Sequence, residues 1–117
     1  MKLRQYVRVT VQCPVECIGD DFFAEGMVIN LSIGGLTITC KQQPTPGMSL
    51  KLRVSLPDDE APLVVQHAIV VWSKGGQFGV KALSMGESGQ KRLNDFIVNH
   101  VNKASYRRSV SAPKSDT

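Results

Sequence analysis

The stretch that decides the fold is Val7–Cys17, which reads VRVTVQCPVEC. Its odd-numbered positions hold only Val and Cys, whereas its even-numbered positions hold Arg, Thr, Gln, Pro and Glu. This strict period of two puts the apolar side chains on one face, so the stretch predicts a β-strand with one buried and one solvated face. Because proline has no amide hydrogen to donate, we expect Pro14 at an edge, a bulge or a break in this strand.

Five further strands are predicted downstream. Leu50–Leu56 alternates as clearly as the first strand. Leu63–Trp72 is almost continuously apolar, which is typical of a strand that is covered on both faces or crosses a barrel seam. Turn-forming residues separate these stretches from the remaining three, Phe22–Ile29, Leu36–Cys40 and Gln77–Leu83. Six short strands joined by short turns predict an all-β unit, either a small antiparallel barrel or a sandwich.

The hydrophobic period changes near the C-terminus from two to between three and four. Apolar residues with this spacing lie on one face of a helix, and here they are Leu93, Phe96, Ile97 and Val101. Ser84 and Glu87 have the spacing of a capping box at the start of that helix, and Ser88 is an alternative cap.

The length and composition indicate one globular domain. The chain has 117 residues, of which 42% are apolar and 21% are charged, so disordered and fibrous classes are excluded. No apolar run approaches the ~20 residues of a membrane span, and the charged beginning lacks the pattern of a signal peptide. We therefore expect a cytoplasmic protein with a domain over residues 1–103 and a flexible basic tail over residues 104–117.

The residue types that usually perform catalysis or bind metals lack suitable partners in the sequence. Cys13, Cys17 and Cys40 are odd in number and do not have the paired spacing of a zinc site, so we expect reduced thiols in the core. Neither His67 nor His100 lies in a nucleophile motif, and the acidic residues cluster in turns. With no phosphate loop or dinucleotide-binding motif, the sequence predicts no enzyme, no metal and no cofactor.

Two local patterns carry side chains that can bind an anionic, base-containing ligand. Arg4 and Arg8 lie four residues apart where the chain enters its first strand, and the net charge is +4. A guanidinium can donate two parallel hydrogen bonds to guanine O6 and N7 or to a phosphate. The second pattern, NLSIGG, begins at Asn30 in the turn expected between the second and third strands. The side-chain amide of Asn30 and the hydroxyl of Ser32 can form hydrogen bonds with a guanine edge or a phosphate oxygen.

Together, R-x-x-x-R and [D/N]-x-S-x-x-G, followed by a barrel and a terminal helix, resemble the PilZ domain, which binds the bacterial second messenger cyclic di-GMP. The resemblance covers about residues 3–103 and extends through Val70-Val71-Trp72 and Phe78-Gly79-Val80, which look like the family's closing hairpin. It implies a six-stranded antiparallel PilZ-type β-barrel with a C-terminal α-helix. Asn30 stands where many members have Asp, and this variant removes a negative charge beside a dianionic ligand.

The resemblance also implies which residues bind cyclic di-GMP. Gly34 and Gly35 are expected to provide a positive φ or a close approach to the ligand. The alternatives are that the arginines are solvated and that the turn residues bond only their own backbone. We expect Trp72 in the core, and the number of ligand molecules bound stays open. The predicted site comprises Arg4, Arg8, Asn30, Ser32, Gly34 and Gly35.

These observations predict a cyclic di-GMP receptor that changes conformation on binding and signals to a protein partner in motility, exopolysaccharide or biofilm control. One alternative is a PilZ-like protein-interaction module that does not bind cyclic di-GMP. Another is a small barrel that binds single-stranded nucleic acid, but aromatic residues make up only 6% of the chain and are not interleaved with basic ones. No DNA or RNA partner is therefore expected.

Overall fold

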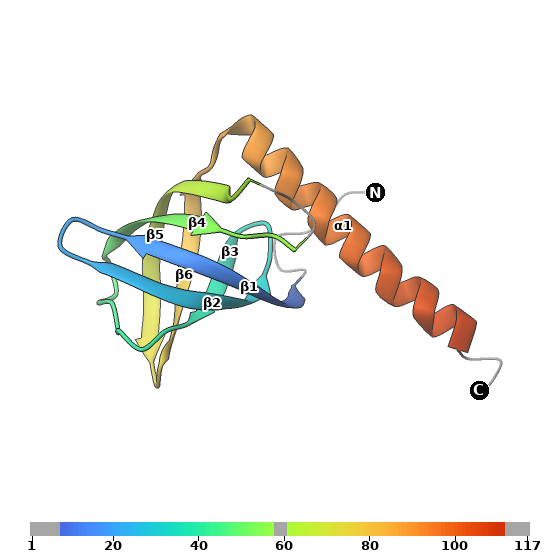
Figure 1. The fold of residues 1–117 in the computed structure, drawn as a ribbon, viewed down its shortest axis with the longest axis horizontal. Coiled ribbons are helices and arrows are strands. Elements are labelled where there is room, and N and C mark those ends of the chain that lie inside the picture. The colour runs from blue at the N-terminus through green and yellow to red at the C-terminus, as the bar shows by residue number, and fades with distance from the viewer. Residues whose placement is uncertain (1–7, 58–60, 112–117) are drawn as a thin grey trace.

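Six strands form a closed barrel that is followed by one long helix (Figure 1). This computed structural model describes residues 8–57 and 61–111, with side chains described as far as His100. Each strand pairs antiparallel with its two neighbours in the order β1-β2-β3-β6-β5-β4. The elements are β1 (Val9–Ile18), β2 (Phe23–Leu31), β3 (Gly35–Thr39), β4 (Ser49–Val54), β5 (Leu63–Lys74), β6 (Gln77–Ser84) and α1 (Gly86–Ser111). The predicted barrel with a C-terminal helix is confirmed.

The alternation in β1 builds one wall of the core as predicted. All five odd positions from Val9 to Cys17 are buried inside the barrel. Pro14 lies just outside the β1–β4 ladder, which begins at the pair Val15–Val54, and its carbonyl accepts a hydrogen bond from the Ser55 amide at 2.9 Å. The break in pairing removes the need for a proline donor.

A bulge in β5 overturns the prediction for the end of that strand. Val70 pairs with Val80, whereas Trp72 pairs with Gly79, so Val71 is an extra residue on the β5 side. The extra residue reverses the alternation, because side chains change face at every step. Trp72 is therefore 40% exposed, and our expectation that it lies in the core is wrong. Exposed residues interrupt β5 elsewhere too, so the strand is not covered on both faces.

A second bulge has the same effect in β2. Val28 pairs with Ile38 and Asn30 pairs with Thr37, which leaves Ile29 as the extra residue. Val28 is fully buried, and an unbroken period of two would also turn Asn30 into the barrel. The bulge instead turns Asn30 outward, and Leu31 takes the next buried position.

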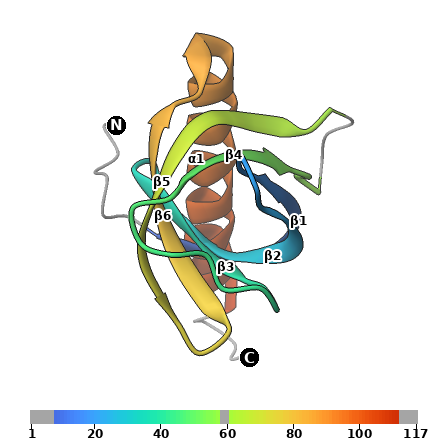
Figure 2. The same cartoon turned by 90° about the vertical axis from the view of Figure 1, so that its left-hand side faces the viewer.

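The helix α1 packs its apolar face on the barrel. Leu93 and Ile97 are buried and Phe96 is partly buried against the core, as the spacing predicts. The guanidinium of Arg92 donates to the carbonyls of Ala61 (2.9 Å) and Pro62 (3.2 Å), which holds the helix to the start of β5. Figure 2, viewed from the side of the β1–β2 hairpin, shows α1 behind the barrel. In the described residues, no helix is long and apolar enough to cross a membrane.

Both ends of α1 differ from the prediction. Ser84 ends β6 and the helix begins at Gly86, so neither Ser84 nor Ser88 is the residue at its start. At the other end the backbone stays helical to Ser111, which is past the start of the predicted tail over 104–117. No proline interrupts this stretch before Pro113, which lies outside the described residues. A domain boundary at residue 103 stays a prediction.

The described residues contain no disulfide, and all three cysteines are buried thiols, as expected. Burial and the neighbouring Cys40 thiol raise the pKa of Cys17 from 9.0 to about 12. Between these values the unfolded chain loses a proton that the folded chain keeps, so stability falls as pH rises.

We expect the free energy of unfolding to fall by on the order of 1 kcal/mol per pH unit above about pH 9 through Cys17. Urea unfolding at pH 7, 9, 10 and 11 measures this loss. Cys17→Ala is the control, because it should flatten the pH dependence. Equal slopes for the two proteins would assign the loss to other groups.

Candidate functional site

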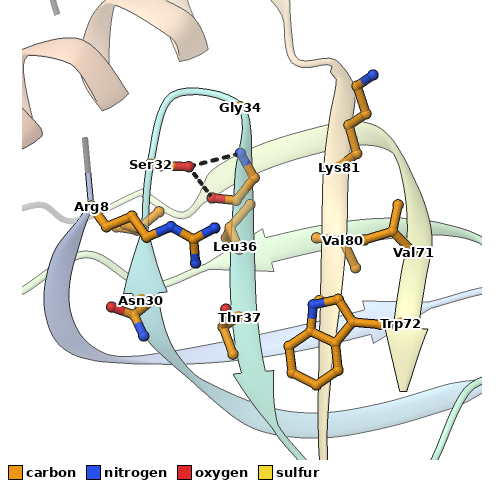
Figure 3. A pocket seen from close by; sticks show the side chains of 13 residues that line it. Arg8, Asn30, Ser32, Gly34, Leu36, Thr37, Val71, Trp72, Val80 and Lys81 are labelled. Atoms are coloured by element: carbon orange, nitrogen blue, oxygen red, sulfur yellow. Dashed lines mark hydrogen bonds between the residues drawn. The ribbon is translucent and has the colours of Figure 1, made fainter. Parts of the chain in front are cut away.

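A pocket of about 300 Å³ lies on the outer surface of the barrel (Figure 3). It brings together five of the six residues predicted to bind ligand, and the sixth, Arg4, lies outside the described residues. The polar, glycine and aromatic residues that line it are Arg8, Asn30, Ser32, Gly34, Gly35, Thr37, Trp72, Gly79 and Lys81. Two patterns that are more than 20 residues apart in the sequence therefore meet at one place.

The strand pairing explains why these residues meet. Asn30, Thr37, Gly79 and Trp72 are successive partners across β2, β3, β6 and β5. Three strand spacings separate the two ends of this row, roughly 14 Å along the sheet. The row therefore places an amide at one end and an indole at the other, with Thr37 between them.

Arg8 enters the pocket from the chain segment just before β1. Its neighbour Val9 pairs with Leu31, so Arg8 lies beside the end of β2. Figure 3 shows its exposed side chain extending over the pocket, between Asn30 and the turn that contains Ser32. Its guanidinium can therefore reach a ligand that also contacts Asn30.

Ser32 holds the turn between β2 and β3. Its hydroxyl donates to the Gly35 carbonyl at 3.1 Å and accepts from the Gly35 amide at 3.2 Å. The Ser32 amide also donates to that carbonyl, at 3.0 Å. The alternative in which this serine bonds the backbone of its own turn therefore describes what the structure shows, and Ser32 is only 8% exposed. Because its hydrogen is already used, Ser32 could donate to a phosphate only by giving up the bond to Gly35.

Gly35 allows β3 and β6 to approach each other closely. A Cβ at this position would collide with the Val80 carbonyl of β6. Neither Gly34 nor Gly35 has a positive φ, so of the two expected reasons for a glycine only a close approach to the ligand stays a prediction. The Gly34 carbonyl accepts from the Ala82 amide at 3.0 Å, which closes the same β3–β6 edge of the pocket. Asn30 likewise belongs to β2 and not to the turn.

Four of the polar, glycine and aromatic residues that line the pocket are not in the predicted site. They are Thr37, Trp72, Gly79 and Lys81. Lys81 pairs with Gly35 and is exposed at the rim, where its ammonium adds positive charge. The register of β3 against β6 would have revealed Thr37 and Lys81, but a single sequence does not contain it.

We expect Ser32→Ala to lower stability by about 1 kcal/mol, because it removes both side-chain hydrogen bonds of the turn. Urea unfolding measures this change, with Ser55→Ala, in the loop after β4, as a matched control. A Ser32→Ala protein as stable as the wild type would contradict the role of Ser32 in the turn.

Comparison with known proteins agrees with this architecture. The family model described as "PilZ domain" matches residues 2–99. The chain is similar in fold to the PilZ domain of CeSA from a cellulose-synthesizing bacterium, at 14% identity and a TM-score of 0.63, covering 80% of this chain and 96% of that one. It is also similar to the Bacillus subtilis inhibitor of motility (MotI/DgrA), at 19% identity and a TM-score of 0.67, covering 96% of this chain and 54% of that one.

A comparison with curated proteins gave no match. At these identities the two structures support the fold alone, whereas the family model spans both motifs and every strand of the barrel. This chain belongs to the PilZ domain family.

Proposed function

We propose that this protein is a cytoplasmic receptor that binds cyclic di-GMP in the pocket between Arg8 and Trp72 and signals to a protein partner. PilZ domains are a family of cyclic di-GMP receptors, and this membership supports the choice of ligand. The observation that carries the proposal is that Arg8, Asn30 and Ser32 line one pocket although they come from two separate motifs.

The chemistry of the pocket fits a ligand that carries both guanine and phosphate. The guanidinium of Arg8 can hold guanine O6 and N7, or a phosphate, through two parallel bonds. The amide of Asn30 can accept from guanine N1–H or N2–H and can also donate. The exposed part of the Trp72 indole offers a flat surface for a base. Lys81 adds a second positive charge at the rim, which suits a dianion.

Binding would also act on the segment that leads into β1. Arg4 lies four residues before Arg8, so a ligand held by Arg8 is within reach of the same segment. Contacts with both arginines would favour one arrangement of this segment over others. The rearranged segment would then present a new surface to a protein partner in motility, exopolysaccharide or biofilm control.

We assign no reaction to the protein. The Nε2 atom of His67 lies 3.1 Å from the Ser49 hydroxyl, a contact that the sequence did not suggest. Both side chains are exposed on the barrel surface, whereas an activated serine needs a third group to orient its base and a site that excludes water. In this proposal the protein therefore acts only by binding its ligand and its partner.

Calorimetric titration of the full chain with cyclic di-GMP tests the proposal. Trp72 is the sole tryptophan, so its fluorescence gives a second reading from the pocket itself. We expect saturable heat and a fluorescence change with cyclic di-GMP, and neither with GTP or the linear dinucleotide at the same concentration.

No response to cyclic di-GMP in either measurement would overturn the proposal and favour the protein-interaction module. Binding of an unrelated oligonucleotide with steep salt dependence would instead favour a nucleic-acid partner.

A further inference from the structure

The Trp72 side chain lies against the backbone of the neighbouring strand at a glycine. Trp72 of β5 and Gly79 of β6 are paired across the hairpin. A Cβ built on Gly79 would overlap the indole Nε1 and would lie 2.6 Å from Cε2 and 2.8 Å from Cδ1. All three of its nearest atoms therefore belong to the five-membered ring of Trp72. Any side chain at position 79 would occupy the space that the indole now fills.

The backbone does not otherwise require a glycine here. Gly79 does not have a positive φ, unlike Gly75 and Gly76 in the turn of the same hairpin. Glycine in the interior of a strand weakens it and often marks a close approach of another group. At Gly79 that group is the indole, which covers the glycine and leaves it buried.

The bulge and the glycine determine the position of the indole together. The extra residue Val71 turns Trp72 to the outside of the barrel, and Gly79 then allows the ring to lie down against β6. Figure 3 shows the indole at the β5–β6 side of the pocket, across from Arg8 and Asn30. Trp72 stays 40% exposed as a residue and lines the pocket, so part of its surface remains available to a ligand.

We propose that Gly79 is a positioning residue of the ligand site, which holds the Trp72 indole against β6 as a fixed wall for a planar base. The ligand part of this inference rests on the proposed function, whereas the position of the indole does not. Gly79→Ala is expected to push the ring away from β6 and so to remove a stacking surface that is already in place.

The test compares Gly79→Ala with Gly89→Ala in α1. Gly89 is a matched control, because its Cβ would meet other atoms only at 3.6 Å or more and its φ is not positive. We expect Gly79→Ala to weaken cyclic di-GMP binding by roughly 5- to 150-fold, the range for one lost base–aromatic stack. Without ligand, it should increase acrylamide quenching of Trp72 fluorescence. Gly89→Ala should change neither.

A double variant keeps the inference testable if Gly79→Ala does not fold. In a Trp72→Ala background the collision is gone, so Trp72→Ala/Gly79→Ala should unfold at the same urea concentration as Trp72→Ala and bind cyclic di-GMP equally. If Gly79→Ala lowers stability and affinity as much in the Trp72→Ala background as in the wild type, the inference is overturned. The glycine would then be required by the backbone and not by the indole. A Gly79→Ala protein with wild-type affinity and quenching would also overturn the inference.

The same set of variants distinguishes failure of the proposed function from failure of the positioning role of Gly79. If the wild type does not bind cyclic di-GMP, the proposed function fails, while quenching and the double variant still decide whether Gly79 positions the indole. If the wild type binds and Gly79→Ala changes neither affinity nor quenching, the positioning role alone fails.

Discussion

Arg8→Ala should bind cyclic di-GMP roughly 5- to 150-fold more weakly than the wild type, a loss of about 1–3 kcal/mol for one bidentate contact. Arg8 lines the pocket, is exposed and extends toward the centre of the site (Figure 3). It carries the only guanidinium among the described residues that line this pocket. Calorimetric titration at fixed ionic strength measures the loss.

Two further variants identify the cause of that loss. Arg8→Lys keeps the charge but has no planar fork, so it should recover only part of the affinity. Arg53→Ala is the matched control, because Arg53 pairs with Glu16 at 3.5 Å on the outside of the barrel and does not line the pocket. Wild-type affinity in Arg8→Ala, or an equal loss in Arg53→Ala, would remove Arg8 from the site.

Phe78→Ala should destabilise the fold by about 3–5 kcal/mol, the usual cost of truncating a buried Phe. Phe78 is 0% exposed and heads the fully buried side chains when these are ranked by volume. It belongs to the core cluster and lies on β6 between β3 and β5, so the cavity would open inside the barrel. A domain of this size is stable by about 5–15 kcal/mol, so most of that margin would be lost.

Urea unfolding monitored by circular dichroism measures this loss, and Phe23→Ala is the matched control. Phe23 is 57% exposed at the start of β2, so its truncation should change stability by less than about 0.5 kcal/mol. A similar shift of the unfolding midpoint in both variants would show that Phe78 does not hold the core.

The strands could be predicted because each carries its own local pattern. In β1 the period of two continues to Cys17, and the structure buries all five odd positions from Val9 onward. The same rule fails at Trp72 and is incomplete at Asn30, because each follows a bulge in which one strand has a residue more than its partner. A bulge is a property of two strands in register, so the sequence of one strand does not contain it.

Most residues of the candidate site could be predicted, but not all of the contacts that they make. Arg8 and Asn30 lie together as the two motifs indicate. Ser32 and Gly35 instead bond each other, and the glycine also lets β3 approach β6. Side-chain type alone cannot separate a hydroxyl that meets a ligand from one that closes a turn, because the same atoms serve both purposes.

The closed barrel also limits how a partner can recognise this protein. Because β1 pairs with β4 as well as with β2, the described strands close into a barrel, and each strand is paired on both sides over part of its length. The proposed partner would therefore find only short stretches of free strand edge, which disfavours docking by addition of a strand of its own, a common mode of peptide capture. We therefore expect the proposed partner to recognise mainly side chains on the outside of the barrel or on α1.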